Sequence, residues 1–153
     1  MRRVNVVVLL LAVACSSTTS GAAPPCSLPP ATARFGHDAH LTVDVADTDA
    51  AREHGLMGVT SLPADHGMAF VWDAPTEATF WMKDTLIPLS IAFVDQDDRV
   101  VTVREMTPCE ADPCPTYPAT APYTTAVEAN ANWFEEHGVQ AGDRMQLQRG
   151  GCA

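Results

Sequence analysis

The sequence predicts a mainly β protein, a compact sandwich-like or barrel-like domain that carries one or two short helices. Three observations predict this fold class. About seven short segments have the alternation or the β-branched and aromatic content of strands. Turn-forming residues, among them 12 prolines and 9 glycines, separate these segments. Segments with helical character are few and short, and this pattern is typical of two packed sheets or a barrel.

Seven segments have the character of β-strands. Residues 41–45 and 144–148 alternate apolar and polar side chains, which is the period of a half-buried strand. Residues 89–94 form a continuous apolar run, and an acidic turn joins this run to residues 99–103, which predicts a hairpin. The other strand-like segments are residues 68–72, 79–82 and 123–127.

Two segments favour helix. Residues 50–54 follow good N-cap residues and allow about one and a half turns before Gly55 stops the helix. Residues 129–137 are the stronger candidate, with two aromatic side chains to pack and Gly138 as the stop. Between the helices, the proline-rich stretch over residues 109–122 predicts a long irregular loop.

The first residues have the pattern of an export signal. Two arginines at residues 2–3 precede an apolar stretch over residues 4–14 that is too short for a stable membrane anchor. Cys15 follows Ala-Val-Ala and precedes two serines, which resembles a bacterial lipobox. We therefore expect residues 1–14 to be a signal peptide and Cys15 to carry a lipid that holds the protein on the outer face of the cell membrane. The same pattern also suits an ordinary signal peptidase, which would leave a secreted or periplasmic protein.

The rest of the chain divides into a tether and one domain. Residues 15–36 are rich in proline, serine and threonine and predict a flexible tether. Residues 37–153 are long enough for a single β-rich domain. The net charge of −10 argues against a nucleic-acid partner, because no basic surface replaces the phosphate counterions. The expected membrane contact is through the N-terminal lipid, since an acidic surface is repelled by anionic head groups.

Five cysteines support export. If Cys15 is lipidated, four remain, and four cysteines allow three disulfide pairings in an oxidising compartment. Cys109 and Cys114 are close enough in sequence to close a short loop, which leaves Cys26 with Cys152. A metal site at Cys109 and Cys114 is the weaker alternative, because the second close pair that a structural zinc site needs is missing.

Short motifs follow one another in a recognisable order between residues 41 and 147. The most specific is Phe-Trp-Met-Lys-Asp-Thr at residues 80–85, followed by Ile-Pro-Leu at residues 87–89. The others are residues 55–57, 62–63, 67–70, 91–93 and 117–118, Glu128 and residues 142–143. Together they resemble the domain of unknown function 192 family. The resemblance implies a compact, mainly β sandwich and no particular reaction.

The chain departs from the pattern of this family at three places. Gly58 and Val59 stand where family members usually carry an arginine. Asp84 stands where asparagine is usual, and Ser90 where aspartate is frequent. If the arginine and the aspartate belong to a shared site, that site is altered in this chain.

The leading functional hypothesis is a binding patch. Lys83 is the only lysine, and in a strand it shares one face with Trp81 and Thr85. A lysine beside an indole can recognise an anionic or sugar-like ligand from the cell envelope. We therefore predict a ligand site formed by Trp81, Lys83, Thr85 and Glu128, with Met57 nearby.

A structural role for this patch is the competing and commoner explanation. Lys83 would then cap the end of the barrel in an ion pair with Glu128 or Asp84. On either interpretation we expect a non-enzymatic binding or envelope-associated protein, because the chain lacks a nucleophile elbow, a phosphate loop and a dinucleotide fingerprint. We expect no cofactor and no resident metal.

Two other functions stay open. A hydrolase of an envelope polymer would need two acids, or an acid and a histidine, facing one cleft. A copper-binding protein would use soft ligands, and the set available is Met57, Met68 and Met82 with His54 or His66. The alternative for the methionines is that they fill irregular gaps in the core.

Overall fold

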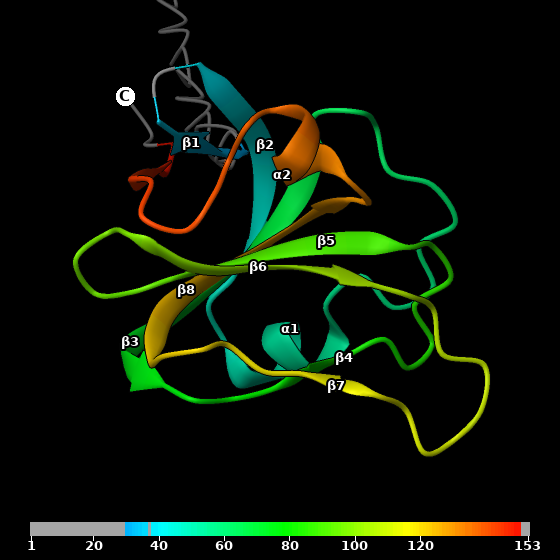
Figure 1. The fold of residues 1–153 in the computed structure, drawn as a ribbon. Helices are drawn as coiled ribbons and strands as arrows, with labels where there is room; N and C mark the ends of the chain where they lie inside the picture. The colour runs from blue at the N-terminus through cyan, green and yellow to red at the C-terminus, as the bar shows by residue number, and fades with distance from the viewer. Residues whose placement is uncertain (1–29, 37, 151–153) are drawn as a thin grey trace, which may run out of the picture.

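The computed structural model describes residues 30–36 and 38–150. Its strands are β1 (Ala31–Phe35), β2 (Ala39–Ala46), β3 (His66–Thr76), β4 (Phe80–Trp81), β5 (Leu89–Val94), β6 (Val100–Met106), β7 (Thr116–Tyr117), β8 (Tyr123–Asn130) and β9 (Met145–Gln148), and its helices are α1 (Asp49–His54) and α2 (Trp133–Glu136). Seven strands form one curled sheet in the order β6-β5-β8-β3-β2-β1-β9, while β4 pairs with β7 in a small second sheet (Figure 1). The prediction of a mainly β domain with one or two short helices is confirmed.

The curl brings the two edges of the large sheet together at one end. Arg99, just before β6, and Arg144, just before β9, form an isolated antiparallel bridge. The Val100 amide donates to the Asp143 carbonyl at 2.9 Å, and the Met145 amide donates to the Asp98 carbonyl at 2.8 Å. The sheet is therefore a half-barrel that is joined at one end of its seam.

One pair of neighbours in the large sheet is parallel. Strands β2 and β3 run in the same direction, whereas every other adjacent pair is antiparallel. Parallel neighbours need a connection that returns along the sheet, because a tight turn reverses the chain. Residues 47–65 form this crossover, and α1 lies within it.

Each face of the sheet has its own core, because successive side chains of a strand point to opposite faces. Figure 1 shows α1 and α2 on opposite sides of β5. The α1-side core comprises Ala46, Leu56, Phe70, Met82, Leu89, Ile91, Phe93, Met106, Tyr123 and Ala126. The α2-side core includes Phe35, Leu41, Val43, Ala69, Ala92, Val127, Ala129, Trp133 and Phe134. All six residues of β5 are buried, which explains the continuous apolar run in its sequence.

The observed bounds of most elements differ from the prediction by a few residues, and the differences are larger at α2 and β1. The helix expected over residues 129–137 is wrong in its first part, since β8 continues to Asn130 and α2 covers only Trp133–Glu136. The reason is non-local: Ala129 pairs with Gly67 on one side and with Ser90 on the other. At the other end of the chain, β1 occupies the last part of the expected tether.

Several predictions concern residues outside the described part of the chain. They are the signal peptide over residues 1–14, lipidation at Cys15, and the pairing of Cys26 with Cys152. Within residues 30–36 and 38–150, neither helix has the length and apolar content needed to cross a membrane.

Candidate functional site

A carboxyl group lies buried in the middle of the large sheet. Glu128 belongs to β8, where Met68 of β3 and Ile91 of β5 are its cross-strand partners. Its side chain therefore shares the face of the α1-side core, and the residue is only 5% exposed. No hydrogen bond or ion pair to the Glu128 carboxyl is formed by any residue that the structure describes. Its carboxyl oxygens keep some contact with solvent, because no fully buried side-chain oxygen of the described residues lacks a hydrogen-bond partner. A glutamate this deep in a sheet without a protein partner is unusual, since most buried polar groups find one.

Burial controls the protonation of this carboxyl. Removal from water disfavours the charged form, and it raises the pKa of Glu128 from 4.5 to about 8. No ion pair within the described residues opposes this effect. Glu128 is therefore mainly protonated at neutral pH, and it becomes a carboxylate only when a positive charge approaches or the pH rises.

A small cavity opens above Glu128. Its volume is about 30 Å³, which is room for one or two water molecules. The crossover forms one wall, β4 with Phe80 and Trp81 forms another, and Phe70 of β3 completes the aromatic part of the lining. The complete lining is Arg52, Glu53, His54, Gly55, Leu56, Met57, Phe70, Phe80, Trp81, Thr85 and Glu128.

Local sequence fixes the crossover wall. Thr48 caps α1, because its hydroxyl oxygen accepts a hydrogen bond from the Ala51 amide at 3.2 Å. Gly55 ends the helix at φ 49°, and a Cβ at this position would lie 3.3 Å from the ring of Phe70. A glycine thus allows both the left-handed turn and the close packing of the helix end on the sheet.

The two walls are joined by a main-chain hydrogen bond. The amide of Gly58 donates to the carbonyl of Asp84 at 2.9 Å. Asp84 has φ 54°, a left-handed conformation that aspartate and asparagine tolerate better than most residues. The chain therefore turns at Asp84 and brings Thr85, which is 6% exposed, into the cavity lining.

Arg52 lines the cavity, and both terminal nitrogens of its guanidinium group bind other residues. One terminal nitrogen donates to the Val71 carbonyl at 2.6 Å, and the other pairs with Asp49 at 2.6 Å. The guanidinium also lies 5.2 Å from the centre of the Trp72 ring. These contacts hold the guanidinium on Trp72 and Asp49, and they leave Glu128 without an internal cation.

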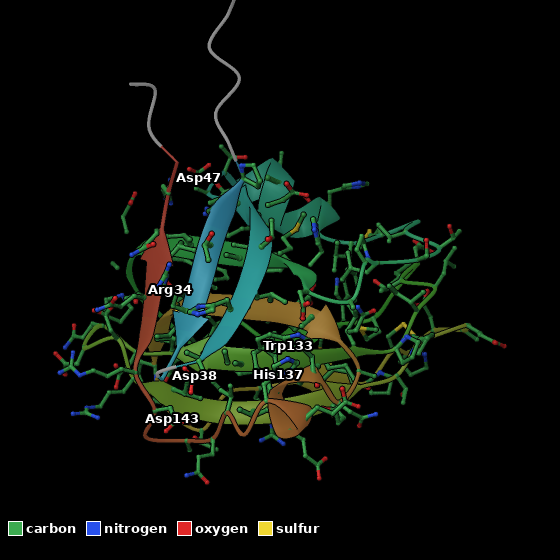
Figure 2. All side chains as sticks on the ribbon, turned by 90° about the horizontal axis from the view of Figure 1, so that it is seen from above. Arg34, Asp38, Asp47, Trp133, His137 and Asp143 are labelled. Atoms are coloured by element: carbon green, nitrogen blue, oxygen red, sulfur yellow. A yellow bond between two sulfur atoms is a disulfide. The ribbon has the colours of Figure 1, made fainter. Side chains whose placement is uncertain are left out.

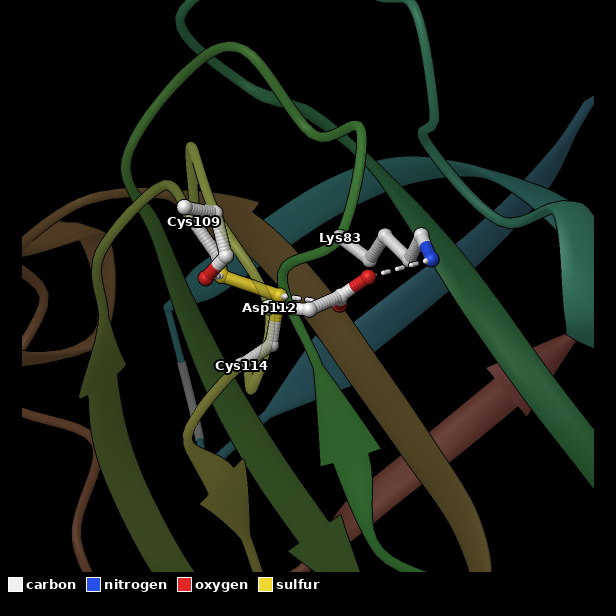
Figure 3. Close-up of polar contacts among 5 residues, drawn as sticks. Lys83, Cys109, Asp112 and Cys114 are labelled. Atoms are coloured by element: carbon white, nitrogen blue, oxygen red, sulfur yellow. Dashed lines mark hydrogen bonds and ion pairs between the residues drawn. A yellow bond between two sulfur atoms is a disulfide. The ribbon is translucent and has the colours of Figure 1, made fainter.

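Lys83 lies outside the cavity. Its Nζ atom is 3.1 Å from a carboxylate oxygen of Asp112 (Figure 3). The same atom is 5.7 Å from the centre of the Trp81 ring. The expected ion pair of Lys83 with Glu128 or Asp84 is replaced by this pair with Asp112. The alternation of a strand fails here because β4 ends at Trp81 and the chain turns at Asp84.

A disulfide shapes the loop that carries Asp112. Cys109 and Cys114 are bonded, with their Cα atoms 5.7 Å apart, and Asp112 lies between them in sequence (Figure 3). The disulfide predicted at these two cysteines is therefore present. Because Asp112 holds Lys83 and Lys83 lies over Trp81, the loop is connected to the rim of the cavity.

Four of the five predicted site residues meet at one place. Met57, Trp81, Thr85 and Glu128 all line the cavity, and Lys83 does not. Sequence analysis did not single out Phe70 and Phe80 as site residues, although both stand in the motifs that resemble the family. Arg52 and Glu53 carried no signal beyond membership of a short helix.

The possible copper ligands are only partly brought together. His54 and Met57 line the cavity, while Met82 is 1% exposed and belongs to the α1-side core. His66 lies at the start of β3, and Met68 stands beside Glu128 on that strand. In the described part of the chain, no three His, Cys, Asp or Glu side chains are arranged to hold a metal ion.

The departures from the family pattern fall in different surroundings. Gly58 and Val59 directly follow the crossover wall, so the position of the usual arginine is beside the cavity. Ser90 shares its face of the sheet with Ala92 of the α2-side core, and its hydroxyl is hydrogen-bonded to the Glu105 carboxylate. The change at Ser90 therefore does not reach the cavity above Glu128.

A second polar cluster lies at α2 but its polar atoms are used internally. The rings of Trp133 and His137 are stacked with their centres 4.2 Å apart (Figure 2). The indole nitrogen of Trp133 donates to Asp65 at 3.1 Å, and Nδ1 of His137 lies 2.8 Å from the Trp133 carbonyl oxygen. This cluster fixes α2 on the sheet and leaves no group without a partner comparable to Glu128.

Comparison with known proteins identifies one family and similar solved structures. The DUF192 model, described as uncharacterized ACR, matches residues 31–147. A protein of unknown function from Novosphingobium aromaticivorans DSM 12444 is 31% identical, with a TM-score of 0.69 over 78% of this chain and 84% of that chain. A protein from Sinorhizobium meliloti 1021, described as a candidate transcription regulator, is 29% identical, with a TM-score of 0.70 over 80% of this chain and 96% of that chain. Among curated protein sequences, none matches this chain.

Proposed function

This chain belongs to the DUF192 family, and from that premise we propose that it is a non-enzymatic binding module that takes a small polar group of its ligand into the cavity above Glu128. The observation that carries the proposal is a carboxyl that is 5% exposed, has no partner among the described residues and lines an open cavity. Burying a polar group without a partner costs stability. A ligand that supplies the missing hydrogen bonds offsets this cost, so the buried acid would favour binding of such a ligand.

We place this function outside the cytoplasm. The export pattern over residues 1–14 supports this location, and so does the Cys109–Cys114 disulfide, because such bonds persist in oxidising compartments. Lipid at Cys15 would hold the module at the membrane surface, and processing without lipidation would release it. Transcription regulation is not extended to this chain, since a net charge of −10 provides no basic surface for DNA.

A hydrolase acting on envelope polymer is the second candidate. The observation in its favour is that a protonated Glu128 can donate a proton near neutral pH, while Glu53 and His54 line the same cavity. The cavity volume of about 30 Å³ opposes it, because a sugar ring does not fit into that space. Turnover of cell-wall fragments that Glu128→Gln abolishes would replace the binding proposal with this one.

The test of binding is a thermal-shift screen of the purified mature protein against small amines, amides, alcohols, acids and envelope fragments. A ligand at a hundred times its dissociation constant stabilises the native state by about 2.7 kcal/mol. We expect a hit that Glu128→Gln or Thr85→Val weakens. Glu135→Gln is the matched control, because Glu135 is exposed on α2 and far from the cavity lining. Stabilisation that is equal in all variants would exclude the cavity as the site.

A further inference from the structure

The cavity also indicates which chemical class it recognises. Resting on the proposed binding function, we infer that the group bound above Glu128 is a primary ammonium at the end of an extended ligand, whose remainder leaves the cavity past Trp81. Charge, lining, volume and the exposed rim each support this inference.

The charge is the first argument. Glu128 has no cation within ion-pair distance among the described residues, and the two nearby cations are already engaged. Arg52 is held by Asp49 and the Val71 carbonyl, and Lys83 is held by Asp112. An ammonium that enters the cavity would meet a carboxylate that is largely shielded from bulk water, and such charge-assisted hydrogen bonds are among the strong ones.

The donors of an ammonium fit the acceptors present. An ammonium has three N–H donors and no acceptor. Glu128 offers two carboxylate oxygens, and the Thr85 hydroxyl, which itself donates to the Lys83 carbonyl at 3.4 Å, retains lone pairs. A guanidinium brings five donors on a larger planar group. The cavity volume of about 30 Å³ is too small for this group.

The lining favours an organic cation over a metal ion. Phe70, Phe80 and Trp81 contribute aromatic rings to the walls. Aromatic rings attract alkylammonium groups through their quadrupoles. Calcium needs six to eight oxygen ligands, and the two acidic residues of the lining, Glu53 and Glu128, do not supply that number.

Volume and exposure place the rest of the ligand outside. About 30 Å³ accommodates an ammonium group but no ring. Trp81 of the lining is 46% exposed, and Leu86, which follows Thr85 in the chain, is 58% exposed. These are the exposed large apolar side chains of the described chain, and they provide a surface for an apolar segment next to the ammonium.

Ammonium binding is coupled to the proton of Glu128. The carboxyl must lose its proton when the ammonium binds, so affinity rises with pH until the carboxyl is ionised in the free protein. The charged and titratable groups around it are Arg52, Glu53 and His54 from the crossover, and Asp44 and Arg104 from the same row of the sheet. For a carboxyl whose pKa is about 8, affinity for an alkylammonium rises about five- to tenfold per pH unit between pH 6 and pH 8.

The test compares three probes of similar size and different charge: n-butylammonium, n-butanol and n-butyrate. Each is titrated into isotope-labelled mature protein at pH 6, 7 and 8, and the NMR signals of the Thr85 methyl group and the Trp81 indole are followed. We expect n-butylammonium to shift both signals, with the stated gain in affinity as the pH rises. Glu128→Gln should weaken it at least tenfold and remove the pH dependence, while Glu135→Gln binds as the wild type does.

The outcomes distinguish failure of the ammonium inference from failure of the proposed binding function. If n-butanol or n-butyrate binds at these signals as tightly as n-butylammonium, the ammonium class is wrong and the binding cavity stands. If n-butylammonium binds with no pH dependence and equally to Glu128→Gln, the inference is also overturned, because the carboxyl takes no part. If none of the three probes, nor any compound of the thermal-shift screen, moves these signals, the proposed function itself fails.

Discussion

Gly67 lies directly against the main chain of Glu128. A Cβ atom built on Gly67 would overlap the carbonyl oxygen of Glu128 and would also press on the side chain of Leu41. The strand that carries the buried acid is thus held at a distance from β3 that only glycine permits. The position of the carboxyl therefore depends on a residue with no side chain in the cavity.

Gly67→Ala should destabilise the protein by about 2–3 kcal/mol, because the added Cβ overlaps the Glu128 carbonyl oxygen and the paired strands must shift to relieve the overlap. Urea unfolding of the two proteins measures the difference. Gly58→Ala is the comparison: a Cβ there meets no neighbouring atom, and only the left-handed conformation at φ 76° is penalised, by about 1 kcal/mol. Equal losses in the two variants would contradict the close contact between β3 and β8.

Glu128→Gln should change how stability depends on pH. The pKa of Glu128 is about 8 in the folded protein and 4.5 when unfolded, so between these values the unfolded chain gives up a proton that the folded protein keeps. The contribution of Glu128 to stability is therefore complete below pH 4.5 and is lost at about 1.4 kcal/mol per pH unit up to pH 8.

The measurement is the free energy of unfolding of the wild type and of Glu128→Gln at several pH values. Between pH 4.5 and 7 the difference between the two should move by about 3 kcal/mol in favour of the glutamine variant. The difference isolates Glu128, since all other titrating groups are shared. A difference that is constant with pH would mean that the carboxyl is ionised in the folded protein.

Reduction of the Cys109–Cys114 disulfide should loosen the loop that holds Lys83. In the chain-entropy model, opening so short a loop costs about 2 kcal/mol of stability. The double variant Cys109→Ser, Cys114→Ser should lose this amount in urea unfolding, while Asp112→Asn loses at most about 1 kcal/mol, because the Lys83–Asp112 pair is largely exposed. A double variant as stable as the wild type would show that the disulfide does not constrain the folded loop.

Trp81 and Lys83 should differ in their effect on ligand binding. Trp81→Ala removes an aromatic wall of the cavity and should weaken an ammonium probe about tenfold. Lys83→Ala should change the affinity by no more than about threefold, because Lys83 lies over the Trp81 ring and does not line the cavity. The NMR titration used above measures both. A larger loss in Lys83→Ala would mean that Lys83 leaves Asp112 to contact the ligand.

Local patterns predicted the strands better than the element ends. The apolar run over residues 89–94 predicted a strand in a hairpin, and the structure has this strand with the same ends. The helix predicted to begin at residue 129 failed, because Ala129 finds partners on Gly67 and Ser90 that are distant in sequence. Cross-strand pairing of this kind leaves no trace in the periodicity of one segment.

The candidate site could be predicted from the sequence only in part, for a similar reason. Strand alternation predicts that Trp81 and Thr85 share a face, the family motifs add Met57 and Glu128, and the fold brings these four to one cavity. Lys83 was grouped with them by strand alternation, which ends where Asp84 adopts φ 54°. No local pattern reports that a glutamate in β8 lacks a partner, because that follows from what three other elements place around it.

The parallel pairing of β2 and β3 has a consequence for how this fold can diversify. The chain must return along the sheet between these strands, and residues 47–65 that do so supply the roof of the cavity, while Glu128 in the floor belongs to the most constrained part of the sheet. Surface connections tolerate changes in length and sequence far better than paired strands. A protein with this fold can therefore change the crossover above the cavity while the acidic residue below it stays in place.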